Sequence, residues 1–135
     1  MAGTLTVDAL KASTGVLATQ NGMTGIAKAW CNWQGGEGNT AGTINQSFNV
    51  SSITVNTSGD YTVNFTTTMA NANYVVSGGA SRVDATTYGP YSLGVYSGTT
   101  PTTTAVRVIV GYGGSRASGG IPLISPQVYI AIFGA

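Results

Sequence analysis

Residues 52–65 read SITVNTSGDYTVNF, two alternating runs on either side of a turn sequence. Apolar side chains at every second position are typical of a half-buried β-strand. Gly59 can adopt the positive φ that a bulged hairpin loop requires, and Asp60 is expected to cap the turn. The stretch therefore predicts a β-hairpin with Thr62 and Asn64 on its outer side. Its buried face is expected to consist of Val55, Tyr61, Val63 and Phe65.

The same alternation recurs on both sides of the hairpin, and no segment keeps a helical period. Further strands are predicted over residues 4–10, 26–33, 44–50, 74–80, 91–96, 104–112 and 128–133. Short strands at a spacing of about ten residues are typical of an all-β protein. We predict an antiparallel β-sandwich or jelly-roll of about eight or nine strands. Residues 1–25 would form an extended N-terminal arm, and residues 26–135 the β domain.

Side-chain direction follows from position along each predicted strand. Trp30 and Trp33 face opposite sides of residues 26–33, so at least one lies in the core or an interface. Residues 128–133 are apolar on both faces, which requires cover on both, from a central position in the sheet or from another subunit. Arg107 points away from the core. On residues 44–50, one face is expected to carry Ile44, Gln46, Phe48 and Val50. The predicted core and interface residues are Trp30, Trp33, Phe48, Tyr61, Val63, Phe65, Val108, Ile130 and Phe133.

The composition describes a single domain with an unusual surface. The chain has 135 residues, of which 7% are charged, against about 25% in ordinary soluble proteins. The polarity comes instead from 20 Gly, 20 Thr, 12 Ser and 9 Asn residues. Large aliphatic side chains are sparse for a self-sufficient core, and a weakly charged surface is easily buried. We therefore expect a homo-oligomer.

Several function classes conflict with this composition. The chain has no His, one Cys and a net charge of +1. These counts argue against a triad with His, an intrachain disulfide, a zinc site and nucleic-acid binding. Neither a transmembrane helix nor a signal peptide is recognisable, so we expect synthesis in a cytoplasm without membrane insertion. No metal or cofactor is expected.

Candidate catalytic groups are few. Cys31 lies in mid-strand without a base and is expected to be a small core residue. Glu37, Asp60 and Asp84 all fall in predicted turns. A glycan hydrolase with paired carboxylates, tested through Glu37 and Asp84, remains an alternative. The main expectation is that the chain is not an enzyme.

Aromatic residues give the candidate binding site. Tyr88, Tyr91 and Tyr96 cluster with Arg82 around the loops of residues 81–103. Aromatic rings beside Ser, Thr and Asn suit contact with sugars or proteins, because they offer contact area at low entropic cost. These four residues are the candidate receptor-binding residues. The alternative is structural, with Tyr91 in the core and Tyr96 at a strand end.

Several segments resemble a module of predicted tail-fibre proteins of tailed phages, especially phages of marine bacteria and cyanobacteria. The resemblance covers residues 26–79 well and 104–135 loosely, and the opening TLTVD (4–8) is similar to the lead-in of such chains. Its most specific motif is GDYTVNFTT. The segments that carry it are KAW (28–30), NW (32–33), SFNVSSIT (47–54), GDYTVNFTT (59–67), ANYVV (72–76) and VYIAIFG (128–134).

The resemblance implies a virion structural protein that is trimeric, and it supplies no catalytic residues. We expect a short homotrimeric tail fibre or fibre tip, docked to other virion proteins by residues 1–25. Its loops at 81–103 and 113–126 would bind host-surface glycan or protein. One alternative is a capsid decoration protein that stabilises the phage head. Another is a β filament in which residues 4–10 are donated to the open sheet edge of a neighbour.

Overall fold

The computed structural model describes residues 26–35, 42–81, 91–112 and 127–134. The described residues contain eight strands and no helix, which confirms the all-β prediction. The predicted strand 4–10 lies outside them. The strands are β1 (Ala27–Gln34), β2 (Thr43–Phe48), β3 (Val50–Thr57), β4 (Asp60–Phe65), β5 (Val75–Ala80), β6 (Tyr91–Val95), β7 (Ala105–Tyr112) and β8 (Val128–Phe133).

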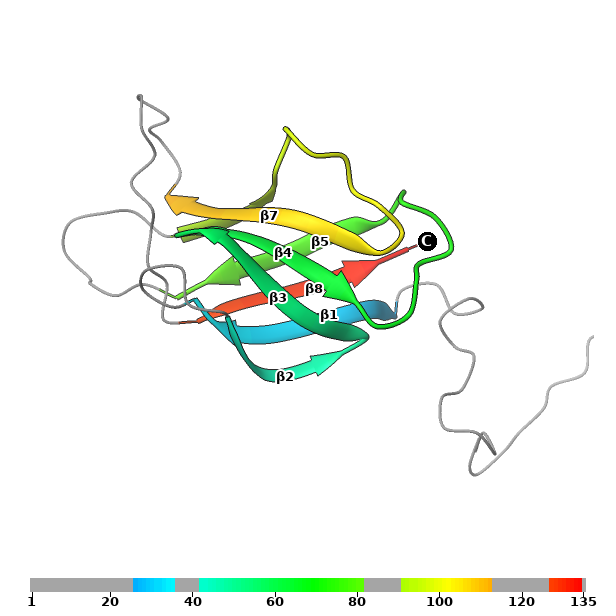
Figure 1. Ribbon diagram of the computed structural model, residues 1–135, viewed down its shortest axis with the longest axis horizontal. Coiled ribbons are helices and arrows are strands. Elements are labelled where there is room, and N and C mark those ends of the chain that lie inside the picture. Colours follow the sequence, from blue (N-terminus) through cyan, green and yellow to red (C-terminus); the bar gives the residue numbers. More distant parts are fainter. Residues whose placement is uncertain (1–25, 36–41, 82–90, 113–126, 135) are drawn as a thin grey trace, which may run out of the picture.

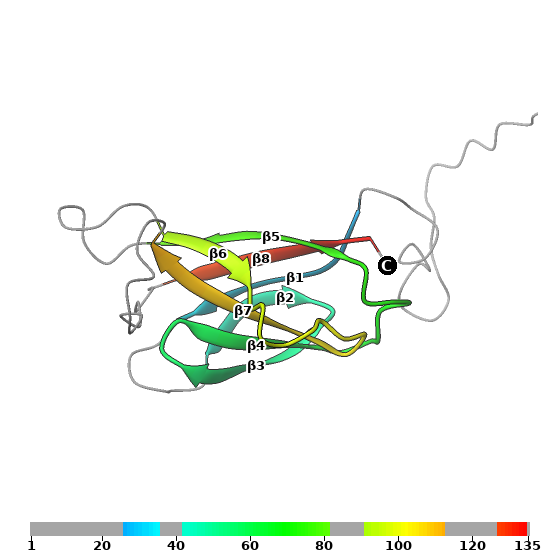
Figure 2. The same cartoon turned by 90° about the horizontal axis from the view of Figure 1, so that it is seen from above.

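The strands form one antiparallel sheet in the order β2-β1-β8-β5-β6-β7-β4-β3. The sheet curls on itself, so that β1, β8 and β5 face β3, β4 and β7, and β6 leads from one layer to the other (Figures 1 and 2). The structure therefore shows a single curled sheet where two separate sheets were expected. The predicted trimer stays a prediction.

The hairpin of residues 52–65 forms as β3 and β4. Ile53 lies opposite Val63, and Val55 lies opposite Tyr61. Gly59 has a φ of 72° in the turn, and the register shifts by a bulge between Val55 and Thr57. The alternation of the sequence therefore produced the predicted hairpin, because one face of both strands is buried in the core.

The core lies between the two layers. Its largest fully buried side chains include Trp33 and Tyr61. Their rings pack edge to face, with the ring centroids 5.5 Å apart. Val106, Val108 and Val110 enter it from β7, and Val128, Ile130 and Ile132 enter it from β8. Buried residues thus alternate with more exposed ones along residues 105–111 of β7 and along β8, as expected for strands with one face on the core.

The predicted strand 44–50 is wrong in two respects. Asn49 has a φ of 54°, which ends β2 and starts β3 in a new direction. A register shift in the β1–β2 pairing sets Ile44 opposite Trp33 on the core side, but Phe48 opposite Trp30 on the outer side. The predicted common face of Ile44, Gln46, Phe48 and Val50 therefore does not exist, because a bulge and a left-handed residue reverse the alternation.

Candidate functional site

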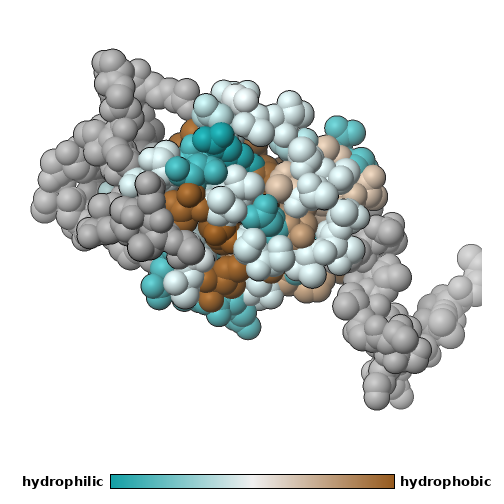
Figure 3. All heavy atoms as spheres, viewed as in Figure 1, coloured by the Kyte–Doolittle hydropathy of each residue, from teal (hydrophilic) through white to brown (hydrophobic). Residues whose placement is uncertain are grey.

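The outer surface of β3, β4 and β7 carries a network of polar side chains, called here the polar face. It is defined by Ser52, Thr54, Asn56, Asp60, Thr62, Asn64 and Arg107. The amide of Asn64 donates to the hydroxyl oxygens of Ser52 and Thr54, at 3.1 Å each. Figure 3 looks onto this side of the molecule and shows pale and teal residues around a smaller brown, apolar area. Amides and hydroxyls bonded across strands thus supply polarity where charge is scarce.

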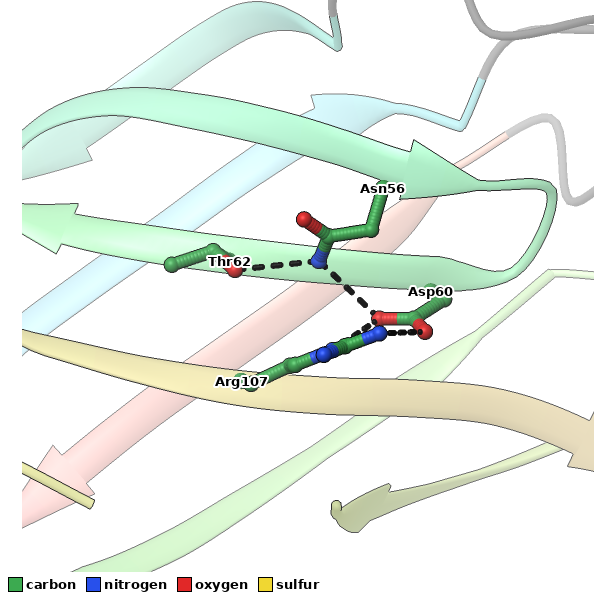
Figure 4. Close-up of polar contacts among 4 residues, drawn as sticks. All are labelled: Asn56, Asp60, Thr62 and Arg107. Atoms are coloured by element: carbon green, nitrogen blue, oxygen red, sulfur yellow. Dashed lines mark hydrogen bonds and ion pairs between the residues drawn. The ribbon is translucent and has the colours of Figure 1, made fainter. Parts of the chain in front are cut away.

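An ion pair lies at one end of the polar face (Figure 4). Arg107 donates to Asp60 through Nε at 2.8 Å and through Nη2 at 2.6 Å. The amide of Asn56 donates to Asp60 Oδ1 and to Thr62 Oγ1, at 3.0 Å each. This bidentate contact ties the hairpin turn to β7.

Asp60 does not cap the hairpin turn as predicted. Its carboxylate accepts hydrogen bonds from the side chains of Arg107 and Asn56, and only 11% of its side chain is exposed. The two hydrogen bonds from Arg107 hold the pKa of Asp60 below its ordinary value; Asn56 acts in the same direction, and burial opposes both. The carboxylate is therefore engaged in a cross-strand contact.

Acid should weaken the fold through this contact. The pKa of Asp60 is lower in the folded chain than in the unfolded chain, where it is about 3.9. Its contribution to stability is therefore complete above the unfolded value and lost as the pH falls through the folded value. We expect the free energy of unfolding of Asp60→Asn to fall less than that of the wild type between about pH 6 and pH 2. Urea denaturation across this range measures it, and equal pH slopes would contradict the assigned contact.

The candidate receptor-binding residues do not form one cluster in the described part of the chain. Arg82 and Tyr88 lie outside it. Tyr91 packs against the core at the first residue of β6. Tyr96 follows the other end of β6, and its ring lies 4.4 Å from the guanidinium carbon of Arg107. Tyr96 therefore lies next to the Asp60–Arg107 ion pair. The sequence did not predict this ion pair, because its two residues are 47 positions apart.

The predicted core and interface residues divide into two groups. The first lies in the core and consists of Trp33, Tyr61, Val63, Phe65, Val108 and Ile130. The second, Trp30, Phe48 and Phe133, is partly exposed. Trp30 pairs with both Phe48 and Ala131, on the outer side of β1. This outer surface of β2, β1, β8 and β5 is a second candidate contact surface, in addition to the polar face on β3, β4 and β7.

The described interior holds no activated nucleophile. Cys31 is 2% exposed, and burial raises the pKa of its thiol to about 11, so the thiol stays protonated at neutral pH. Burial also raises the pKa of Tyr61. No group of three His, Cys, Asp or Glu side chains that could hold a metal occurs among the described residues. Glu37 and Asp84, which carry the hydrolase alternative, lie outside them.

Comparisons with known proteins add no relative. No family model, curated protein or solved structure matches the chain. Within the described ranges, no helix has the length and hydropathy to cross a membrane.

Proposed function

We propose that the chain is a structural protein of a bacteriophage virion, a short homotrimeric tail fibre or fibre tip without enzymatic activity. The observation that carries the proposal is the contrast between two outer surfaces of one sheet. One is a hydrogen-bonded array of amides and hydroxyls, and the other presents Trp30, Phe48 and Phe133. A water-facing surface and an apolar contact surface on a stiff β scaffold suit a subunit of an assembly.

The segments that resemble tail-fibre modules support the same proposal. The motif GDYTVNFTT covers the hairpin turn and β4, and VYIAIFG covers β8. In this proposal residues 1–25 attach the fibre to other virion proteins. The loops at 81–103 and 113–126 face the host and bind glycan or protein. Within the first of these segments, β6 separates Tyr91, which pairs with the end of β7, from Tyr96, which lies against Arg107.

A β filament is the second candidate, because β2 and β3 end the order of described strands. Among these strands, β2 pairs only with β1, and β3 pairs only with β4. An unpaired strand edge can accept an extended segment of a neighbouring molecule. Residues 4–10 would be the donated strand.

The copy number per virion tests the proposal. We expect the chain in purified virions at a small fraction of the copy number of the major capsid protein, because a virion carries few fibres. Quantitative mass spectrometry with isotope-labelled peptides of both proteins measures the ratio. A ratio near one would instead indicate a capsid decoration protein. Absence from virions, together with polymers of the pure protein, would favour the filament.

A further inference from the structure

β8 has two apolar faces, of which the core covers only one. Val128, Ile130 and Ile132 are at most 4% exposed and point inward. Tyr129, Ala131 and Phe133 alternate with them and point outward, and 47% of Tyr129 is exposed. Within the described ranges, no residue supplies the cover that this second apolar face needs.

Neighbouring strands extend this outer surface. Ala131 of β8 pairs with Trp30 of β1, which pairs with Phe48 of β2. On the other side, Phe133 pairs with Val75 of β5, which is 65% exposed. The continuous surface, called here the aromatic face, is defined by Trp30, Phe48, Val75, Tyr129, Ala131 and Phe133.

Gly79 gives the aromatic face part of its shape. It lies opposite Tyr129 in the β5–β8 pairing. A Cβ at Gly79 would come within 2.9 Å of Tyr129 Cε2 and 3.4 Å of its Cζ. The tyrosine ring therefore lies over the glycine and uses the space that a side chain would fill. A ring held in this way presents its other side outward.

Charge and area indicate what can cover the aromatic face. Of the charged residues in the described ranges, Asp60 and Arg107 lie on the polar face, and Lys28 is only 6% exposed. Among the described residues, therefore, none offers an exposed counter-charge to a charged partner on the aromatic face. At ordinary strand spacing and rise, the outer surface of β2, β1, β8 and β5 measures roughly 19 Å across the strands and roughly 20 Å along them. Its projected area is therefore roughly 400 Å². That area is enough for the apolar centre of an interface that buries about 800 Å² on each partner.

We propose that the aromatic face binds another copy of this chain. An uncharged, apolar sheet face is complementary to a second face of the same kind, and sheets pack face to face at about 10 Å. Asn32, Gln46 and Ser77 lie beside the aromatic residues on the same strands and supply the polar rim. The inference rests on the homo-oligomer of the proposed function and assigns its interface.

Val75→Asp tests the interface in the full chain. Because Val75 is already exposed, the subunit should fold, but a carboxylate in the apolar contact should weaken association by about ten-fold or more. Val95→Asp is the matched control, since Val95 is 43% exposed on β6 and outside the aromatic face. Sedimentation equilibrium measures both, with circular dichroism to verify folding. Unchanged association of folded Val75→Asp would overturn the proposal.

Trp30 provides a second measurement that needs no destabilising variant. The chain has two tryptophans, and Trp33 is fully buried. Acrylamide quenching should therefore report on Trp30, and it should rise on dilution as the copies separate. Trp30→Phe should remove this dependence.

Low quenching in a chain that sediments as a monomer would mean that the chain itself covers the face, which would overturn the proposal. An oligomer that persists while Trp30 stays accessible would also overturn it, because another surface then holds the copies together. Neither result changes the copy number per virion, so failure of this inference is distinguishable from failure of the proposed function.

Discussion

Replacing Val63 with aspartate is expected to unfold the chain. Val63 is fully buried in the middle of β4, between Ile53 of β3 and Val106 of β7. A carboxylate there has no partner and costs several kcal/mol, whether it stays charged or takes up a proton. Domains have only about 5–15 kcal/mol of stability in total. Circular dichroism and thermal melting of the purified variant measure the loss.

Thr54→Asp is the matched control for Val63→Asp. Thr54 is exposed on the outer side of β3, where its hydroxyl accepts a hydrogen bond from Asn64. Most exposed substitutions change stability by about 0.5 kcal/mol or less. A soluble Val63→Asp variant as stable as this control would contradict the assignment of β4 to the core.

Asn49→Ala is the second variant with a large expected effect. The side chain of Asn49 donates to the carbonyl oxygens of Lys28 and Thr67, and it accepts from the Thr67 amide at 2.7 Å. Alanine loses these contacts and also resists the φ of 54°. Each hydrogen bond contributes about 1 kcal/mol, and the left-handed backbone costs alanine about 1 kcal/mol more. We expect a loss of about 2–4 kcal/mol, measured by urea denaturation at fixed protein concentration.

Asn49→Gly separates the two causes. Glycine tolerates the left-handed backbone but cannot make the side-chain hydrogen bonds. Its loss should therefore be smaller than that of Asn49→Ala by about 1 kcal/mol. If alanine and glycine are equally destabilising, the backbone conformation at Asn49 carries no cost. If both match the wild type, Asn49 does not join β1 to the end of β4.

Local alternation was a reliable guide where one face of a strand meets the core. It correctly placed Tyr61, Val63 and Phe65 on the inner side of β4, with Thr62 and Asn64 outside. It failed at residues 44–50. There a bulge and a left-handed asparagine change which side of the strand faces the core, and the hydrophobic pattern does not reveal either of them. Asn49 has a short polar side chain that tolerates positive φ, which is the one local signal that could have marked the break.

The candidate surfaces depended far more on tertiary structure. Arg107 was correctly expected to point away from the core, but its partner Asp60 is 47 residues away. The clustering of Tyr91 with Tyr96 was only a prediction from proximity in sequence, and β6 holds the two at opposite ends.

Local sequence patterns are enough to predict the all-β class, the hairpin and the need to cover both faces of β8. They are enough because a period of two decides which side chains share a face, whatever the neighbouring strand is. The position of β8 between β1 and β5 and the contact of Asp60 with Arg107 emerge only in the folded sheet. Pairing between distant strands depends on how the whole sheet closes around its core, and no local pattern carries that information.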